Sequence, residues 1–163
     1  MIKSLDIFDI KFSKILKTKI SPEIGRIRIF LEEISDAKLK VLFFQKFVAR
    51  FAEHESFFVK LLFWESPEEF IEKVLLSKFD ASKIKIIRQK SDDFSDPCVV
   101  WFHGDKLDSV LLYEIILWHF NFELAESPSA NMRVQFSLTE SGNQILWDVY
   151  DDRGCDVYWL KEN

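Results

Sequence analysis

The last third of the chain alternates apolar and polar residues, and this period of two narrows the possible folds more than any other feature. Every second residue is apolar in 132–138 (MRVQFSL) and again in 145–149 (ILWDV). Such alternation is typical of half-buried β-strands. Turn-forming sequences at 139–143 (TESGN) and 151–154 (DDRG) separate the strands, and 155–160 (CDVYWL) closes the chain. We therefore expect an antiparallel β-meander at about 131–160.

The first two thirds of the chain contain both strand-like and helix-like apolar patterns. Apolar stripes and apolar runs predict helices at 37–52 and 106–123, and strands at 25–31, 57–63 and 98–102. A further helix is expected after Ser66-Pro67, with Ser66 as its cap, and Asp105 is expected to cap the helix that follows it. The segment 83–88 suits a short edge strand, and 1–20 a short helix. The predicted fold class is α+β, a mainly antiparallel sheet with helices packed on it, in a single domain over 1–163.

Charge and composition exclude several classes of protein. The 163 residues carry 27 acidic and 22 basic side chains, a formal net charge of −5, with no concentrated basic patch. This argues against a nucleic-acid binder. The most apolar stretch, 110–122, is too short and too polar to cross a bilayer. The N-terminus lacks the pattern of a signal peptide. With only Cys98 and Cys155, we expect a cytoplasmic protein.

Few residues form a recognisable chemical motif. The pair Cys98 and His103 is five residues apart on one predicted strand, so the two side chains point to opposite faces. Cys155 could meet His54 or His119 in three dimensions, although a packed, inert thiol is the favoured interpretation. We interpret His119 as a hydrogen-bonded core residue. The spacing of ligands and glycines predicts no metal site and no phosphate cradle, so no cofactor is expected.

Aromatic residues are unusually frequent on the predicted helix 37–52. Its phenylalanines cover more than half of its circumference: Phe43, Phe44, Phe47 and Phe51. Most aromatic stripes are core, but some of these rings are expected at the surface, where aromatics mark interaction sites.

Four aspartates gather around the last turn: Asp148, Asp151, Asp152 and Asp156. They could hold a hard cation or act as acids and bases, which would make the protein an enzyme. Asp148 and Asp156 would face each other across the hairpin and repel unless neutralised, and Arg153 could neutralise one or two of these carboxylates. The competing interpretation is structural: aspartates in a turn commonly bond its own backbone amides. Gly154 is expected in a left-handed conformation.

The same hairpin carries a resemblance. Its residues Tyr150, Asp151, Asp152, Arg153, Gly154 and Asp156 resemble the Tyr-Asp-Asp-Arg-Gly-x-Asp segment of an uncharacterised bacterial family, and 24–32 (IGRIRIFLE) is more loosely similar. Small acidic proteins of this kind resemble immunity proteins of polymorphic toxin systems, including contact-dependent growth inhibition. That resemblance implies a cytoplasmic, non-enzymatic protein that binds and neutralises a cognate toxin, such as a nuclease.

The predicted partner-binding residues are acidic side chains beside an exposed aromatic ring. They are Asp92, Asp93, Phe94 and Asp96 on a polar loop, with Asp151 and Asp152 at the turn. A purely structural role for the hairpin is the third hypothesis. The oligomeric state is left open by the sequence.

Overall fold

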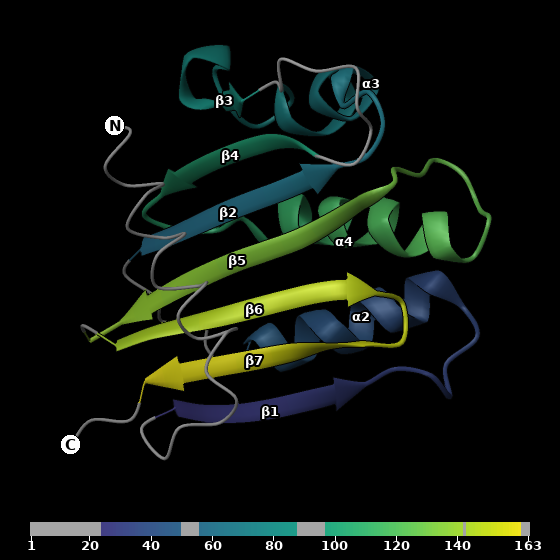
Figure 1. The fold of residues 1–163 in the computed structure, drawn as a ribbon, viewed down its shortest axis with the longest axis vertical. Coiled ribbons are helices and arrows are strands. Elements are labelled where there is room, and N and C mark those ends of the chain that lie inside the picture. Colours follow the sequence, from purple (N-terminus) through teal and green to yellow (C-terminus); the bar gives the residue numbers. More distant parts are fainter. Residues whose placement is uncertain (1–23, 50–55, 88–96, 142, 161–163) are drawn as a thin grey trace.

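The computed structural model describes residues 24–49, 56–87, 97–141 and 143–160, and these form one seven-stranded sheet with helices on it (Figure 1). The strands are β1 (Ile24–Phe30), β2 (Ser56–Phe63), β3 (Lys85–Ile87), β4 (Cys98–Gly104), β5 (Met132–Glu140), β6 (Asn143–Asp151) and β7 (Gly154–Leu160). They lie in the order β1-β7-β6-β5-β2-β4-β3, and every neighbouring pair is antiparallel. The α+β class and the closing meander are therefore confirmed.

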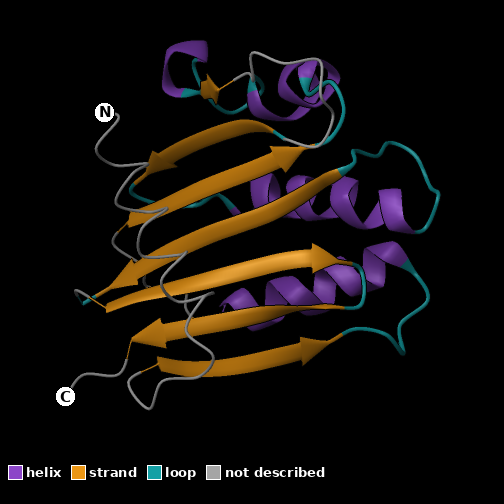
Figure 2. Cartoon of the chain, viewed as in Figure 1, coloured by secondary structure: helices purple, strands orange, loops and turns teal. Residues whose placement is uncertain are grey.

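Two helices cover one face of the sheet, behind it in Figure 2. Helix α2 (Ala37–Val48) connects β1 to β2, and helix α4 (Ser109–Glu123) connects β4 to β5. Because each helix connects two strands that point in the same direction, each helix is antiparallel to the strands that it connects. The strand order makes β1 and β4 point in opposite directions, so α2 and α4 lie antiparallel to each other.

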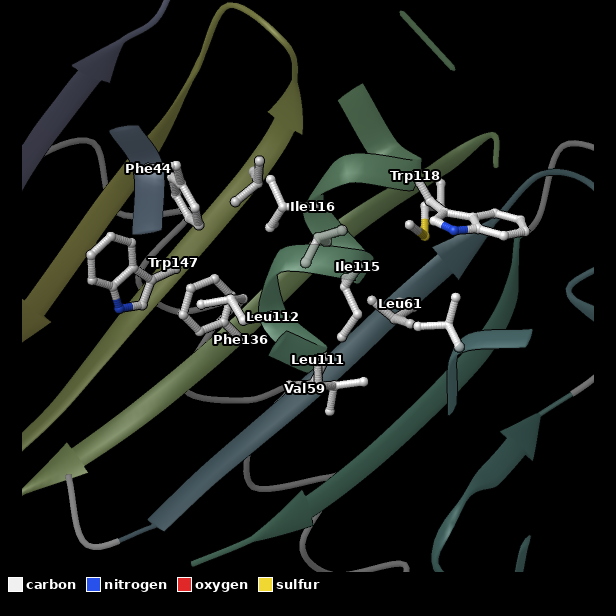
Figure 3. Close-up of a cluster of buried hydrophobic side chains, with 14 of the residues drawn as sticks. Phe44, Val59, Leu61, Leu111, Leu112, Ile115, Ile116, Trp118, Phe136 and Trp147 are labelled. Carbon is white, nitrogen blue, oxygen red and sulfur yellow. The ribbon is translucent and has the colours of Figure 1, made fainter. Parts of the chain in front are cut away.

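The core fills the space between these helices and the sheet (Figure 3). Phe44 of α2 meets the Trp147 ring edge-on, with centroids 5.8 Å apart, and Trp147 stacks on Phe136 at 5.3 Å. All three side chains are fully buried. Helix α4 contributes apolar side chains on several sides, as its sequence predicts, and its Ile115 and Ile116 are both completely buried.

A smaller helical segment covers the β2–β4 side of the sheet. Helix α3 (Glu68–Phe70) continues as a π-helical turn (Ile71–Leu75), and a 3-10 turn (Ala81–Lys83) leads into β3. Phe70 anchors this segment, since its ring lies 5.4 Å from both Phe63 and Trp118. The predicted edge strand is confirmed as β3, which begins two residues later than expected because the 3-10 turn precedes it.

The helix caps differ from the sequence predictions. Asp108, and not Asp105, caps α4 by accepting a 2.9 Å hydrogen bond from the Leu111 amide. The two aspartates have the same capping chemistry, so the sequence alone does not rank them. Helix α3 has Pro67 at its N-cap, and the Ser66 hydroxyl donates to the Glu68 carboxylate instead of capping the helix. The helix predicted within 1–20 lies outside the described residues.

Candidate functional site

The turn between β6 and β7 is the place where the sequence predicts chemistry, and Asp151 shapes it. The Asp151 carboxylate accepts a 2.9 Å hydrogen bond from the Arg153 amide and a 2.8 Å bond from Arg153 Nε. The expectation that an aspartate bonds the backbone of its own turn is thus confirmed, and Arg153 neutralises Asp151. The Asp151 side chain is 14% exposed, whereas that of Arg153 is 67% exposed.

Asp152 ties the same turn to helix α2. Lys40 Nζ lies 2.5 Å from the Asp152 carboxylate and donates a second bond, 2.9 Å long, to the Asp152 carbonyl. The Lys40 side chain is only 3% exposed and that of Asp152 is 17% exposed. Helical spacing places Lys40 on the buried side of α2, three residues after Ala37 and four before Phe44, whereas Lys38 is exposed. The identity of its partner, Asp152, is decided by the tertiary structure.

Asp156 is clamped by two arginines of β1. Arg28 binds the Asp156 carboxylate through two bonds of 2.8 and 3.0 Å, and Arg26 adds a third of 2.8 Å. Burial alone would raise the pKa of Asp156, but the bonds from Arg28 and Arg26 outweigh it and hold that pKa below its ordinary value. The same two guanidinium groups lie over the Tyr150 and Tyr158 rings, each 5.8 Å from the ring centroid.

Asp148 faces Asp156 directly across the hairpin, as the sequence predicts, and it has a counterion of its own. Arg133 of β5 binds it through Nε at 2.8 Å and also through Nη2, and Gln135 adds a weaker contact at 3.3 Å. Arg153, which we expect to neutralise one or two of these carboxylates, binds Asp151. Sequence reasoning did not single out Arg26, Arg28 and Arg133 as counterions. Their alternation on β1 and β5 places them on the same face of the sheet as Asp148 and Asp156, and this pattern could have identified them.

The turn also presses against the strand β1. The Leu31 amide donates a 2.7 Å hydrogen bond to the Arg153 carbonyl, and Gly154 is so close that a Cβ there would lie 1.9 Å from the Ile29 carbonyl oxygen. Gly154 has a positive φ of +158°, a conformation that residues with a side chain rarely adopt, so the expected need for glycine here is confirmed. The two segments that carry the family resemblance, 24–32 and 150–156, therefore hold each other in place.

The remaining candidates fall on different sides of the sheet or outside the described residues. Cys98 packs against the main core whereas His103 stacks beside Phe58 on the opposite face, which confirms their predicted separation. Cys155 is buried, and burial raises the pKa of its thiol, as expected of an inert cysteine. His54, Phe51 and the predicted binding loop with Asp92, Asp93, Phe94 and Asp96 lie outside the described residues.

His119 is a core residue, as predicted, and the Met132 backbone is a hydrogen-bonding group beside its ring. The side chain is completely buried, and neither ring nitrogen completes a hydrogen bond within the described part of the chain. Burial lowers its pKa to about 4, against the smaller opposing effects of Asp151 and of the nearby Met132 backbone. The His119 imidazole is therefore neutral in the folded protein at neutral pH.

One end of the sheet, on the right of Figure 1, is where β1, β2 and β6 end and β5 and β7 begin. The chain segments at this end are rich in acidic residues. Six exposed carboxylates, five in the loops there and one on the last residue of α4, form what we call the acidic end: Glu32, Glu33, Asp36, Glu65, Glu123 and Glu126. Asp151 and Asp152 lie beside them. Burial, with the negative charge of those two aspartates, raises the pKa of Glu123. The carboxylates at this end of the sheet therefore lie close enough to influence one another's ionisation.

The described residues show neither a metal-ligand cluster nor a membrane-spanning helix. No group of three or more His, Cys, Asp or Glu side chains within 24–49, 56–87, 97–141 and 143–160 is placed to hold a metal ion. In those same ranges, every helix is too short or too polar to span a bilayer.

Comparison with known proteins gives no identification. No family model, no curated protein and no solved structure matches the chain. The site must therefore be interpreted from its own geometry.

Proposed function

We propose that this protein is an immunity protein, which binds a cognate bacterial toxin domain in the cytoplasm and neutralises it by direct contact at the acidic end. The observation that carries the proposal is that the chain segments at one end of the sheet together carry six exposed carboxylates. The resemblance of the hairpin to those of small acidic bacterial proteins supports it.

Charge gives the acidic end a physical role in docking. Toxins that cleave nucleic acids bind phosphates with lysine and arginine, so a surface of carboxylates is complementary to their clefts. Opposite charges steer the two proteins together and raise the association rate by roughly 10- to 1000-fold at low salt. In the described loops of the acidic end, at 31–36, 64–67, 124–131 and 152–153, Arg153 is the one exposed cation, and it is bound to Asp151. The local excess of negative charge therefore survives.

The contacts of the hairpin support a scaffold in preference to the catalytic alternative. Asp148, Asp151, Asp152 and Asp156 each bind a lysine or an arginine. Their side chains are at most 17% exposed. A general acid or base needs a carboxylate within reach of a substrate. Under this proposal Asp151 and Asp152 contribute to the field of the acidic end, and the loop at 92–96 stays a predicted contact.

Growth rescue tests the proposal. The toxin domain that the proposal expects beside this gene is expressed in a sensitive bacterium with and without the full-length protein, and the purified pair is analysed by biolayer interferometry. We expect rescue and a 1:1 complex. Toxicity that persists at equal expression, together with no complex, would contradict the proposed function.

Charge-reversal variants test the acidic end itself. Glu33→Lys and Glu126→Lys are each expected to slow association by roughly threefold to tenfold at low salt, with a smaller effect at high salt. Asp105→Lys is the matched control, because Asp105 is exposed at the opposite end of the sheet, after β4. Equal slowing by the control would mean that net charge, and not the acidic end, governs docking.

A further inference from the structure

The outer face of the helix layer exposes apolar side chains from both helices. On α2 they recur at the spacing of one helical stripe, with Leu39 58%, Leu42 46% and Phe43 49% exposed. On α4, Val110 is 53% exposed. An inward stripe of α2, with Val41, Phe44 and Val48, already packs on the sheet. The outward stripe is therefore a second apolar surface, of a kind that marks interaction sites.

A groove lies between the two helices on this face. Its volume is about 410 Å³, and its lining comes from both helices: Leu42, Gln45, Lys46, Ala49, Ser109, Val110 and Tyr113. Gln45 Nε2 donates a 2.6 Å bond to the Ser109 carbonyl, which sets the last turn of α2 level with the first turn of α4. Lys46 and Val110 are thus at the same height along the helix pair.

The two halves of the face carry opposite charge. Helix α2 contains Lys38, Lys40 and Lys46 and no acidic residue, whereas α4 contains no lysine or arginine and places Glu114 one turn after Val110 on this face. Lys40 is turned inward to Asp152, so the outer side of α2 presents Lys38 and Lys46. Such a face is complementary to itself, which is the property that an isologous dimer interface requires.

We infer that this face binds a second copy of the chain, with α2 of each copy laid over α4 of the other. A two-fold axis that runs between the helices and along them produces this arrangement. Rotation about this axis leaves the position of each residue along the helix pair unchanged, so Lys46 of one copy lies opposite Val110 of the other. Glu114 is about one helical turn, 5.4 Å, further along α4 and is within reach of the lysine side chain. An axis across the helices would instead lay α2 on α2 and oppose like charges.

The size of the face sets the expected strength. Helices of 12 and 15 residues are about 18 and 22 Å long, so two of them side by side offer on the order of 500 Å² from each copy. That is near the lower limit of specific interfaces, and we expect a dissociation constant in the micromolar range. This interface does not depend on the proposed function, because it lies on the helix face and not at the acidic end.

Sedimentation velocity of the full-length protein, from about 1 to about 200 μM, tests the dimer. We expect a monomer–dimer equilibrium that Leu42→Glu shifts to monomer throughout. Leu76→Glu is the matched control, because Leu76 is a leucine of similar exposure, 43%, away from the groove, and it should leave the equilibrium unchanged. Circular dichroism confirms that both variants fold. A monomeric wild type, or equal effects of the two variants, would overturn the inference.

A charge swap separates a second copy from any other occupant. Lys46→Glu and Glu114→Lys should each weaken the dimer roughly fivefold, and the double variant should restore it, because both residues come from the same chain. Single variants without effect, or a double variant that stays weak, would contradict the proposed pairing. Binding of the wild type to phosphatidylglycerol vesicles without self-association would assign the face to a membrane and overturn the inference.

Discussion

Gly154 shows at the scale of one residue why the turn tolerates so little change. The space that a side chain would need is taken by the Ile29 carbonyl, and that carbonyl belongs to a backbone held on the edge of the sheet. Neither the strand nor the turn can move without breaking ladder hydrogen bonds. This close approach adds to the positive φ of +158°, which a residue with a side chain rarely adopts.

Gly154→Ala should therefore lower the free energy of unfolding by about 3 kcal/mol, measured by urea denaturation at pH 7. Gly104→Ala is the control, because its Cβ would lie 2.9 Å from the end of the Phe57 ring, which can shift. We expect that variant to cost less than about 1 kcal/mol. Similar losses for the two variants would mean that the Ile29 contact relaxes easily.

His119 makes the stability of the fold depend on pH. Its pKa is about 4 in the folded protein and about 6.5 in the unfolded chain, so between these values the unfolded chain binds a proton that the folded protein rejects. Stability is then full above pH 6.5 and falls as the pH drops toward 4, by on the order of 3 kcal/mol. Urea denaturation of His119→Leu should show a flatter dependence over this range, and an unchanged slope would exclude the histidine as its source.

At the level of helices and strands, the ion pair between Lys40 and Asp152 attaches helix α2 to the hairpin. Lys40 and Asp152 join residues 112 positions apart, and Lys40 is almost without solvent contact. Removing one member of such a pair is costly, because the other charge stays in a poorly solvated place.

Lys40→Met should reduce the free energy of unfolding by about 2–3 kcal/mol, toward the low end for buried pairs because Asp152 keeps some solvent contact. Lys38→Met removes the same charge from an exposed position on the same helix, and a change below about 0.5 kcal/mol is expected in urea denaturation. If both lysines behave alike, the pair contributes little to the attachment of α2.

The first and last described strands of the chain, β1 and β7, are neighbours at one edge of the sheet. β1 pairs with β7 along its full length, and Arg26 and Arg28 bind Asp156 from positions about 130 residues away in the chain. β1 is at the edge of the sheet, so this pairing and its ion pairs hold it in place. Edge elements of this kind open locally before the core does.

Asp156→Ala should loosen β1 without unfolding the centre. Hydrogen exchange measured by mass spectrometry is expected to speed up at least tenfold for β1 amides, whereas amides of the central strand β2 keep their protection. The β2 peptides are thus an internal control. Uniform acceleration in both strands would show that the clamp contributes to global stability, and not to the edge alone.

The periodic segments could be predicted because their physics is local. Alternation in 132–138 and 145–149 places one face of each strand inside, and the stripe of Val41, Phe44 and Val48 does the same for α2. The antiparallel meander and the central position of β2 follow from such patterns. The cap of α4 did not follow, since Asp105 and Asp108 are chemically equivalent until the buried face of the helix has been positioned.

The sequence by itself determined which segments are strands and helices, and which side chains each of them turns inward, because these depend on the chemistry of neighbouring residues. The tertiary structure alone decided what the signature residues contact. Arg26, Arg28, Arg133 and Lys40 reach the hairpin aspartates only after the chain has brought distant strands together. Ion pairs depend on distances of a few ångströms in space, and position along the chain does not specify those distances.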